Sequence, residues 1–301
     1  MFQRVRDRRG VEQQDRMSGS KRWWVAAGLV TLAGLLVAPA PSEADTGADS
    51  DGQTVDFPWN DEQFFYSLRV NGAEAMRATL KTGETRSNGN RSYVPLGLGV
   101  RSFGFFDNIY PVNDRADTYM NPRTLQPYRT EKVFREAGKS STYIVSYAPD
   151  VFRAAVEKRR SEEVHRFFRA VPRTTHDMIT WLYDLRRRGD FRAGDSFRYF
   201  IYDGWKLSHV TLTVIGKEDL YTPAGWFKAW KFDFSRQILK SRPNKQGGKP
   251  AAPVLRVKNP SEHDGYFWLS RDENHLPLRI TIPTSFGAGE AVLIKYNRHR
   301  N

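Results

Sequence analysis

Short segments in which apolar and polar residues alternate recur along the chain, and turn residues separate them. This pattern restricts the possible folds more than any other feature of the sequence. The first pair is FFYSLRV at 64–70 and AEAMRATL at 73–80. Asn71-Gly72 stands between them, and this dipeptide tolerates the positive φ angles of a two-residue hairpin turn. The sequence therefore predicts that the folded part begins with a β-hairpin.

The same scheme recurs along the chain. Residues 118–134 contain the turn pair Asn121-Pro122, and the apolar-alternating run 141–148 follows Gly138-Lys139. Many short strands at this spacing predict a mainly β fold, an antiparallel curled sheet or half-barrel and not a parallel α/β fold. The later strand candidates are residues 196–203, 206–216, 226–234 and 289–296.

One amphipathic helix interrupts the β pattern. Thr174 or Thr175 is expected to cap it, and Gly189 is expected to end it. The arginine triplet 186–188 falls in its last turn, where cations favour the helix dipole, so it is either a solvated turn or an anion-binding patch. We expect the helix to pack on the sheet through Met178, Trp181, Leu182 and Leu185.

The segment SRPNKQGGKPAAP at 241–253 is rich in glycine, proline and basic residues. About fifty residues with strand character follow it, which is too few for a second domain of usual size. The sequence therefore predicts a flexible loop inside one β-rich domain that spans residues 59–297.

The N-terminal region has the order of an export signal. Lys21 and Arg22 precede an uncharged run at 23–40, and small residues follow up to Ala44. This predicts a signal peptide over residues 1–44, with Met17 as an alternative start and an uncleaved membrane anchor as the alternative fate. The polar, acidic residues 45–58 are expected to form a disordered leader.

Charge and composition restrict the classes of partner that this protein is expected to bind. The chain carries a formal net charge of +13 and contains no cysteine, which excludes disulfides, thiolate metal sites and a cysteine nucleophile. An exported basic protein is expected in the periplasm, where it meets anionic lipid or glycan and not nucleic acid. Contact with a membrane surface or with an envelope protein partner is also compatible with this charge.

Ser270, Asp272 and His275 lie within six residues and raise the question of a catalytic triad. No G-x-S-x-G elbow surrounds Ser270, and a hairpin gives no scaffold that orients a base toward a nucleophile. The strand YFWLS, the turn residues 272–274 and the alternating residues after Pro277 instead predict a structural β-hairpin.

Other chemistry has no recognisable signature. The six histidines are scattered without H-E-x-x-H spacing, and Gly97-Leu98-Gly99 lacks the third glycine and the lysine of nucleotide-binding loops. Adjacent carboxylates such as Glu162-Glu163 do not converge in an extended chain. The sequence predicts no metal site and no cofactor, and it favours a non-enzymatic protein.

Several segments resemble the exported bacterial family known as domain of unknown function 3108. The resemblance rests on Trp268-Leu269-Ser270, Leu276 to Ile280, the helix from Asp177 to Arg186, and the terminal run from Gly289 to Leu293. It covers roughly residues 60 to 296. It implies an antiparallel β fold similar in outline to the curled half-barrels of lipoprotein carriers, and it implies no known activity.

Three classes of function remain open. The first is a binding protein or carrier for an amphipathic or anionic envelope component, a lipid or a glycan. The second is a structural or assembly factor that pairs a sheet edge with a protein partner, and the third is an envelope hydrolase with dispersed residues. For the first class the candidate ligand-binding residues, which could also be plain core and helix-end residues, are Trp226, Trp230, Phe234, Arg186 and Arg187.

Overall fold

The computed structural model describes residues 57–89, 91–259, 264–284 and 287–298. The predicted signal peptide and the predicted leader up to residue 56 lie outside these residues. Phe57, which the sequence assigns to the leader, is buried and packs against Trp59 and Tyr183. The folded domain therefore includes at least Phe57.

The fold is built from strands with two α-helices and one 3₁₀ turn in the part of the chain that is described. The helical elements are α2 (Phe105–Ile109), η1 (Pro149–Val151) and α3 (Thr180–Arg188). The strands are β1 (Glu62–Val70), β2 (Ala73–Thr82), β3 (Arg86–Asn88), β4 (Arg91–Ser102), β5 (Asn113–Met120), β6 (Pro127–Glu136), β7 (Lys139–Ala148), β8 (Arg153–Arg160), β9 (Glu163–Ala170), β10 (Thr175–His176), β11 (Ser196–Tyr202), β12 (Leu207–Thr222), β13 (Gly225–Gln246), β14 (Lys249–Asn259), β15 (Gly265–Ser270), β16 (Pro277–Thr284) and β17 (Gly287–Arg298).

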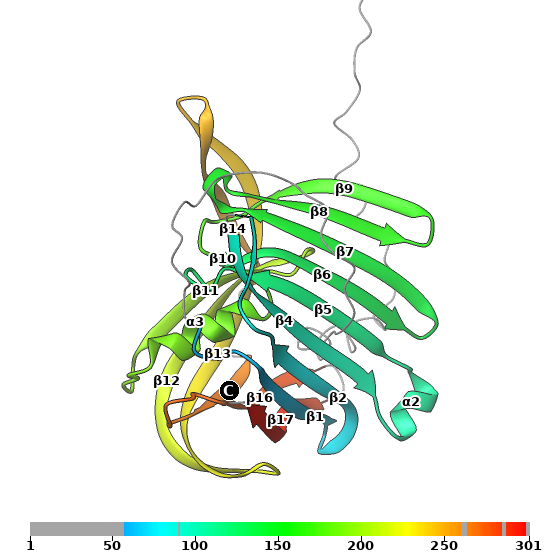
Figure 1. Cartoon of the computed structure of the whole chain (residues 1–301), viewed down its shortest axis with the longest axis vertical. Helices are drawn as coiled ribbons and strands as arrows, with labels where there is room; N and C mark the ends of the chain where they lie inside the picture. Colours follow the sequence, from blue (N-terminus) through cyan, green and yellow to red (C-terminus); the bar gives the residue numbers. More distant parts are fainter. Residues whose placement is uncertain (1–56, 90, 260–263, 285–286, 299–301) are drawn as a thin grey trace, which may run out of the picture.

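The strands form one large antiparallel sheet (Figure 1). Strand pairing follows the order β9-β8-β7-β6-β5-β4-β2-β1-β17-β16-β15-β13-β12-β11-β10, with β10 and β11 parallel. Because β1 pairs with both β2 and β17, the first and last strands meet in the middle of the sheet. Asn71 and Gly72 have φ angles of 49° and 83°, which confirms the predicted hairpin turn.

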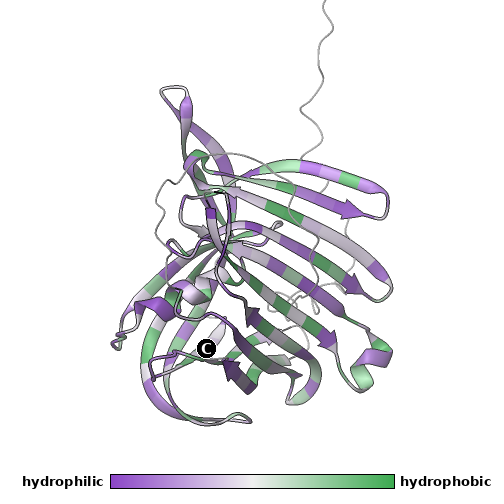
Figure 2. Ribbon diagram, in the orientation of Figure 1, coloured by the Kyte–Doolittle hydropathy of each residue, from purple (hydrophilic) through white to green (hydrophobic). Residues whose placement is uncertain are grey.

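The sheet curls until strands β6 to β8 face strands β11 to β13. Val145 and Val156 share a buried apolar cluster with Tyr202, Leu207 and Leu239 from the opposite wall. Tyr147 also donates a hydrogen bond to the carbonyl of Tyr202 at 2.8 Å. This architecture confirms the predicted curled sheet. Figure 2 shows the alternation of apolar and polar residues along its strands.

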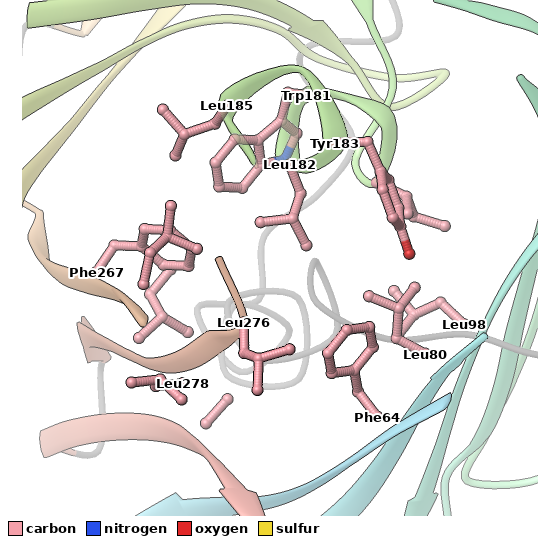
Figure 3. Close-up of a cluster of buried hydrophobic side chains, with 14 of the residues drawn as sticks. Phe64, Leu80, Leu98, Trp181, Leu182, Tyr183, Leu185, Phe267, Leu276 and Leu278 are labelled. Carbon is pink, nitrogen blue, oxygen red and sulfur yellow. The ribbon is translucent and has the colours of Figure 1, made fainter. Parts of the chain in front are cut away.

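Helix α3 fills the concave side of the sheet. Trp181, Leu182 and Leu185 are buried, and Figure 3 shows them above Phe64 and Leu278 of the sheet. Each large apolar side chain buried in this way stabilises the fold by about 1.5–3 kcal/mol. The predicted packing of an amphipathic helix on the sheet is confirmed.

The predicted start of this helix is wrong. Thr175 lies in β10, and its hydroxyl donates to the carbonyl of Pro172 at 2.7 Å. The carboxylate of Asp177 caps the helix instead, because its Oδ1 accepts the backbone N–H groups of Ile179 and Thr180 at 2.9 and 2.8 Å. Thr175 cannot cap because the chain is still extended and paired with β11 at that point, and Thr174 precedes this strand in a turn.

The predicted flexible loop at 241–253 is also wrong. These residues belong to a β-hairpin in which Arg242 pairs with Val254, and Gly247 and Gly248 make the turn with φ angles of 58° and 80°. Pro243, which has no N–H to donate, lies where the register shifts between Arg242 and Asn244. The glycines and prolines therefore mark a turn and a bulge within a long hairpin, which projects at the top of Figure 1.

Candidate functional site

The aromatic residues predicted to bind a ligand have different surroundings in the structure. Trp226 lies near the tip of the β12–β13 hairpin, is 74% exposed, and contacts Tyr221 with ring centroids 5.3 Å apart. Trp230 contacts the buried ring of Phe191, and both Trp230 and Phe234 are partly buried against the core. On β13, therefore, Trp226 is exposed while Trp230 and Phe234 contribute to the core.

The two arginines of the prediction also differ. Arg186 is 1% exposed and makes a bidentate ion pair with Glu62, with N–O distances of 2.7 and 3.0 Å. Arg187 is exposed and donates to the carbonyl of Arg123 at 2.7 Å and to Asp184 at 3.1 Å. Three of the five predicted side chains are thus buried or half-buried, so the five do not form one exposed binding surface.

The Ser270, Asp272 and His275 group forms the predicted structural hairpin. The hydroxyl of Ser270 donates to Asp272 at 2.9 Å and accepts the backbone N–H of Leu276 at 2.7 Å. His275 has a φ angle of 44°, and its ring packs against Phe191. The serine hydroxyl therefore holds the β15–β16 turn together.

A row of polar and aromatic side chains crosses four neighbouring strands at one level. Lys132 of β6 is directly opposite Tyr143 of β7, Tyr143 is opposite Lys158 of β8, and Lys158 is opposite His165 of β9. Residues directly opposite in an antiparallel sheet project from the same face. Val145, two positions from Tyr143, packs against the opposite wall, so this cation–aromatic row lies on the concave face.

The ring of Tyr143 lies between two ammonium groups. Nζ of Lys132 is 5.7 Å from the ring centroid and Nζ of Lys158 is 5.4 Å from it. Phe134 packs edge-on to Tyr143 with centroids 5.8 Å apart, and Lys132 is also 5.4 Å from the Phe134 ring. Two cations on one aromatic patch make a positive potential over an apolar surface.

Lys132 is the most deeply buried member of the row. It is 5% exposed, and its ammonium donates to the backbone carbonyl of Asp203. Burial lowers the pKa of Lys132, while the charges of Asp203 and Asp177 partly oppose this effect. Because the ammonium is partly desolvated, an anion beside it would recover electrostatic free energy that water no longer supplies.

Apolar side chains border the row. Phe167 of β9 is opposite Val156, is 42% exposed, and lies on the same face as the row. The β11–β12 turn touches the row through Gly204, where an added Cβ would lie 3.8 Å from the Tyr143 ring. The next residue, Trp205, is 66% exposed. The combination of exposed aromatic surface and ammonium groups suits a molecule with an apolar part and an anionic part.

A second polar group lies further along the concave face. Asp114 is 1% exposed, its Oδ1 accepts the backbone N–H of Arg135 at 2.8 Å, and its Oδ2 has no hydrogen-bond partner among the described residues. Burial, together with the charge of Glu136, raises the pKa of Asp114 to about 8. Glu136 accepts the Tyr110 hydroxyl at 3.1 Å. Burial therefore favours the protonated form of the Asp114 carboxyl group in the folded protein.

Asp114 predicts a pH dependence of stability. Its folded pKa of about 8 lies above the ordinary aspartate value, so folded protein binds more protons than unfolded protein between pH of about 4 and 8. The free energy of unfolding should therefore fall as the pH rises through this window. We expect Asp114→Asn to be more stable than the wild type at pH 8 by about 1–3 kcal/mol and nearly equal to it at pH 4.

Urea unfolding at several pH values measures this difference, with the exposed Asp150→Asn as the control. The titratable and charged groups around Asp114, namely Glu136, Tyr110 and Arg135, are unchanged in both variants. If the free energy of unfolding depends on pH in the same way for Asp114→Asn and the wild type, the pKa of Asp114 is not raised in the folded protein.

The part of the chain that the structure describes contains neither a metal-binding cluster nor a membrane-spanning helix. No group of three His, Asp or Glu side chains there is placed to hold a metal ion. No helix there has the length and hydropathy that a membrane-spanning segment requires.

A sequence profile that spans most of the chain identifies the family. The profile described as protein of unknown function DUF3108 matches residues 66–294. The chain belongs to the DUF3108 family. This confirms the resemblance that the sequence indicated. No curated protein matches the chain.

Solved structures match this DUF3108 protein over most of its length at low identity. A β-barrel-like protein with the DUF1849 domain from Brucella abortus is 9% identical with a TM-score of 0.48, and the match covers 81% of this chain and 100% of that one. A candidate exported protein with a YmcC-like fold from Bacteroides fragilis is 10% identical with a TM-score of 0.33, over 79% of this chain and 96% of that one.

Proposed function

We propose that this DUF3108 protein is a non-enzymatic periplasmic protein that binds or carries an anionic, amphipathic component of the envelope, a lipid or a glycan with an apolar part. The observation that carries the proposal is the cation–aromatic row of Lys132, Tyr143, Lys158 and His165 on the concave face. The predicted signal peptide and the net charge of +13 support the location and the sign of the ligand charge.

Charged and aromatic side chains of the site would contact two different parts of the ligand. The ammonium group of Lys158, beside the Tyr143 ring, would hold an anionic head group, and the buried Lys132 would add positive potential behind it. Phe167 lies on the same face and would contact the apolar part, and Trp205 in the β11–β12 turn is also exposed. Specificity for the anion should come from the lysines, whereas the aromatic surface should contribute most of the affinity.

Titration with a short-chain anionic phospholipid tests this proposal. We expect dihexanoyl phosphatidylglycerol, kept below its micellar concentration, to bind the protein recovered from the envelope. Lys158→Ala should weaken this binding about tenfold, because it removes a charged partner of the head group. Isothermal titration calorimetry gives the affinity directly.

The matched control is Lys228→Ala, which removes an exposed lysine of β13. It should bind like the wild type. Equal binding by wild type and Lys158→Ala would overturn the proposed site, and so would equal affinity for the zwitterionic lipid dihexanoyl phosphatidylcholine.

One observation favours a second candidate function, an assembly factor of the envelope. Strand β9 pairs with β8 on one side and exposes Val164, Phe167 and Phe168. An edge strand with exposed apolar side chains can add a strand from a protein partner. This function would survive Lys158→Ala, since backbone pairing at β9 does not use that ammonium group.

A further inference from the structure

Helix α2 carries large apolar side chains that the fold does not use. None of its five residues is buried. Phe105 is 73% exposed, Ile109 is 60% exposed, and Phe103 just before the helix is 38% exposed. Figure 1 shows α2 projecting at one corner of the sheet. We refer to Phe103, Phe105 and Ile109 as the apolar tip.

The apolar tip differs from the single exposed apolar residues that most proteins have. Its three side chains lie within seven consecutive residues, on a projection between β4 and β5. Contiguous exposed apolar surface usually marks a site of interaction with another molecule or a membrane. Hydrophobic burial in this protein cannot explain the choice of these residues, because they are not in its core.

Cationic side chains lie near the apolar tip. A groove of about 330 Å³ beside α2 is lined by Arg101, Arg135 and Lys139, together with Asp107. The guanidinium of Arg77 lies 3.6 Å from the centroid of the Phe103 ring. Arg77 also pairs with Glu74, whereas the groove brings three cations and one carboxylate together.

We propose that the apolar tip docks this protein on the surface of an anionic phospholipid bilayer. Aromatic and aliphatic side chains enter the boundary between head groups and acyl chains, and neighbouring cations bind the anionic head groups. The tip supplies the first kind of residue and the groove supplies the second. A bilayer fits this arrangement because the apolar residues project outward and the cations lie behind them on neighbouring strands.

The docking site is separate from the cation–aromatic row. Arg135 alternates with Phe134 along β6, so the guanidinium of Arg135 and the row lie on opposite faces of the sheet. The groove is at the end of β6, where Val112 just after α2 bridges Glu136, and Lys132 of the row lies four positions earlier in the same strand. Docking would therefore bring the row close to the bilayer, but it does not depend on ligand binding there.

The absence of cysteine allows a position-specific test. Ile109→Cys is labelled with an environment-sensitive nitrobenzoxadiazole dye and mixed with vesicles of phosphatidylglycerol and phosphatidylcholine. We expect a blue shift and an intensity gain at this position. Trp226→Cys, labelled in the same way at another exposed apolar site, should not respond.

A binding measurement on the same vesicles completes the test. Phe105→Ser/Ile109→Ser should lower the partition coefficient about tenfold. The wild type should bind vesicles that contain phosphatidylglycerol more tightly than vesicles of phosphatidylcholine alone. Arg101→Gln/Arg135→Gln should remove this difference. Binding of dihexanoyl phosphatidylglycerol should be unchanged in the tip variant, which separates this proposal from the proposed ligand site.

Three results would overturn the proposal. The first is an unchanged emission at position 109 when vesicles are added. The second is an equal response at position 226. The third is a blue shift that grows with protein concentration without vesicles, which would indicate that a second copy of the chain covers the tip.

Discussion

Replacing Arg186 with alanine is expected to lower the free energy of unfolding by about 3–5 kcal/mol, because it leaves a buried carboxylate without its partner. Arg186 and Glu62 both have fully buried side chains, and the two N–O contacts of 2.7 and 3.0 Å make a bidentate pair. Arg186 also donates to the carbonyl of Asn274 at 2.9 Å. Chemical unfolding measures the loss.

The neighbouring arginine provides the control. Arg187 is exposed and lies on the same turn of α3, so Arg187→Ala should change the free energy of unfolding by less than about 1 kcal/mol. If Arg186→Ala costs no more than Arg187→Ala, the buried pair does not stabilise the attachment of α3.

A double variant separates the effect of losing the ion pair from the effect of leaving one charged partner buried alone. Replacing a buried ion pair with apolar residues of similar volume is often neutral, whereas removing one partner is not. Glu62→Met/Arg186→Met should therefore be more stable than Glu62→Met alone or Arg186→Met alone. The Tyr296 hydroxyl, which donates to Glu62 at 2.7 Å, loses its acceptor and limits the recovery.

The strands and the helix could be predicted because local sequence determines them. Asn71-Gly72 selects the hairpin turn by its backbone preference, and Val210, Leu212 and Val214 alternate toward the core as the period of a strand requires. The apolar face of α3 is equally local. These features need no knowledge of distant parts of the chain.

The candidate site could not be predicted because it depends on register. Strand β6 places Arg129 and Glu131 on one face and Thr130 and Lys132 on the other, so polarity does not show which face is concave. The alignment of Lys132 with Tyr143 and Lys158 appears only when three strands are paired. A one-residue shift would turn every side chain of a strand to the opposite face.

The burial of Arg186 could not be predicted from the sequence of the helix for the same reason. In the sequence it is one of three arginines in the last turn, where solvated cations are common. Its burial depends on Glu62, which lies 124 positions away in the chain. The capping residue was missed for a similar reason, since the pairing of β10 with β11 keeps Thr175 extended and leaves the cap to Asp177.

Asp177→Ala is expected to lower the free energy of unfolding by about 3 kcal/mol, the sum of a lost helix cap and of buried donors left without an acceptor. Oδ1 of Asp177 accepts the first N–H groups of α3. Oδ2 accepts the hydroxyls of Thr118 on β5 and Thr130 on β6, the latter at 2.7 Å. One carboxylate therefore fixes the start of the helix to two strands of the concave face.

The same carboxylate links stability to the candidate site. Thr130 and Lys132 are alternate residues of β6 on the concave face, so loosening β6 from α3 should also displace the ammonium of Lys132. We expect Asp177→Ala to weaken binding of dihexanoyl phosphatidylglycerol as well as stability, whereas the exposed Asp150→Ala should affect neither. Loss of stability with full ligand affinity would show that β6 keeps its position without the helix. The cation–aromatic row would then be organised by the sheet alone.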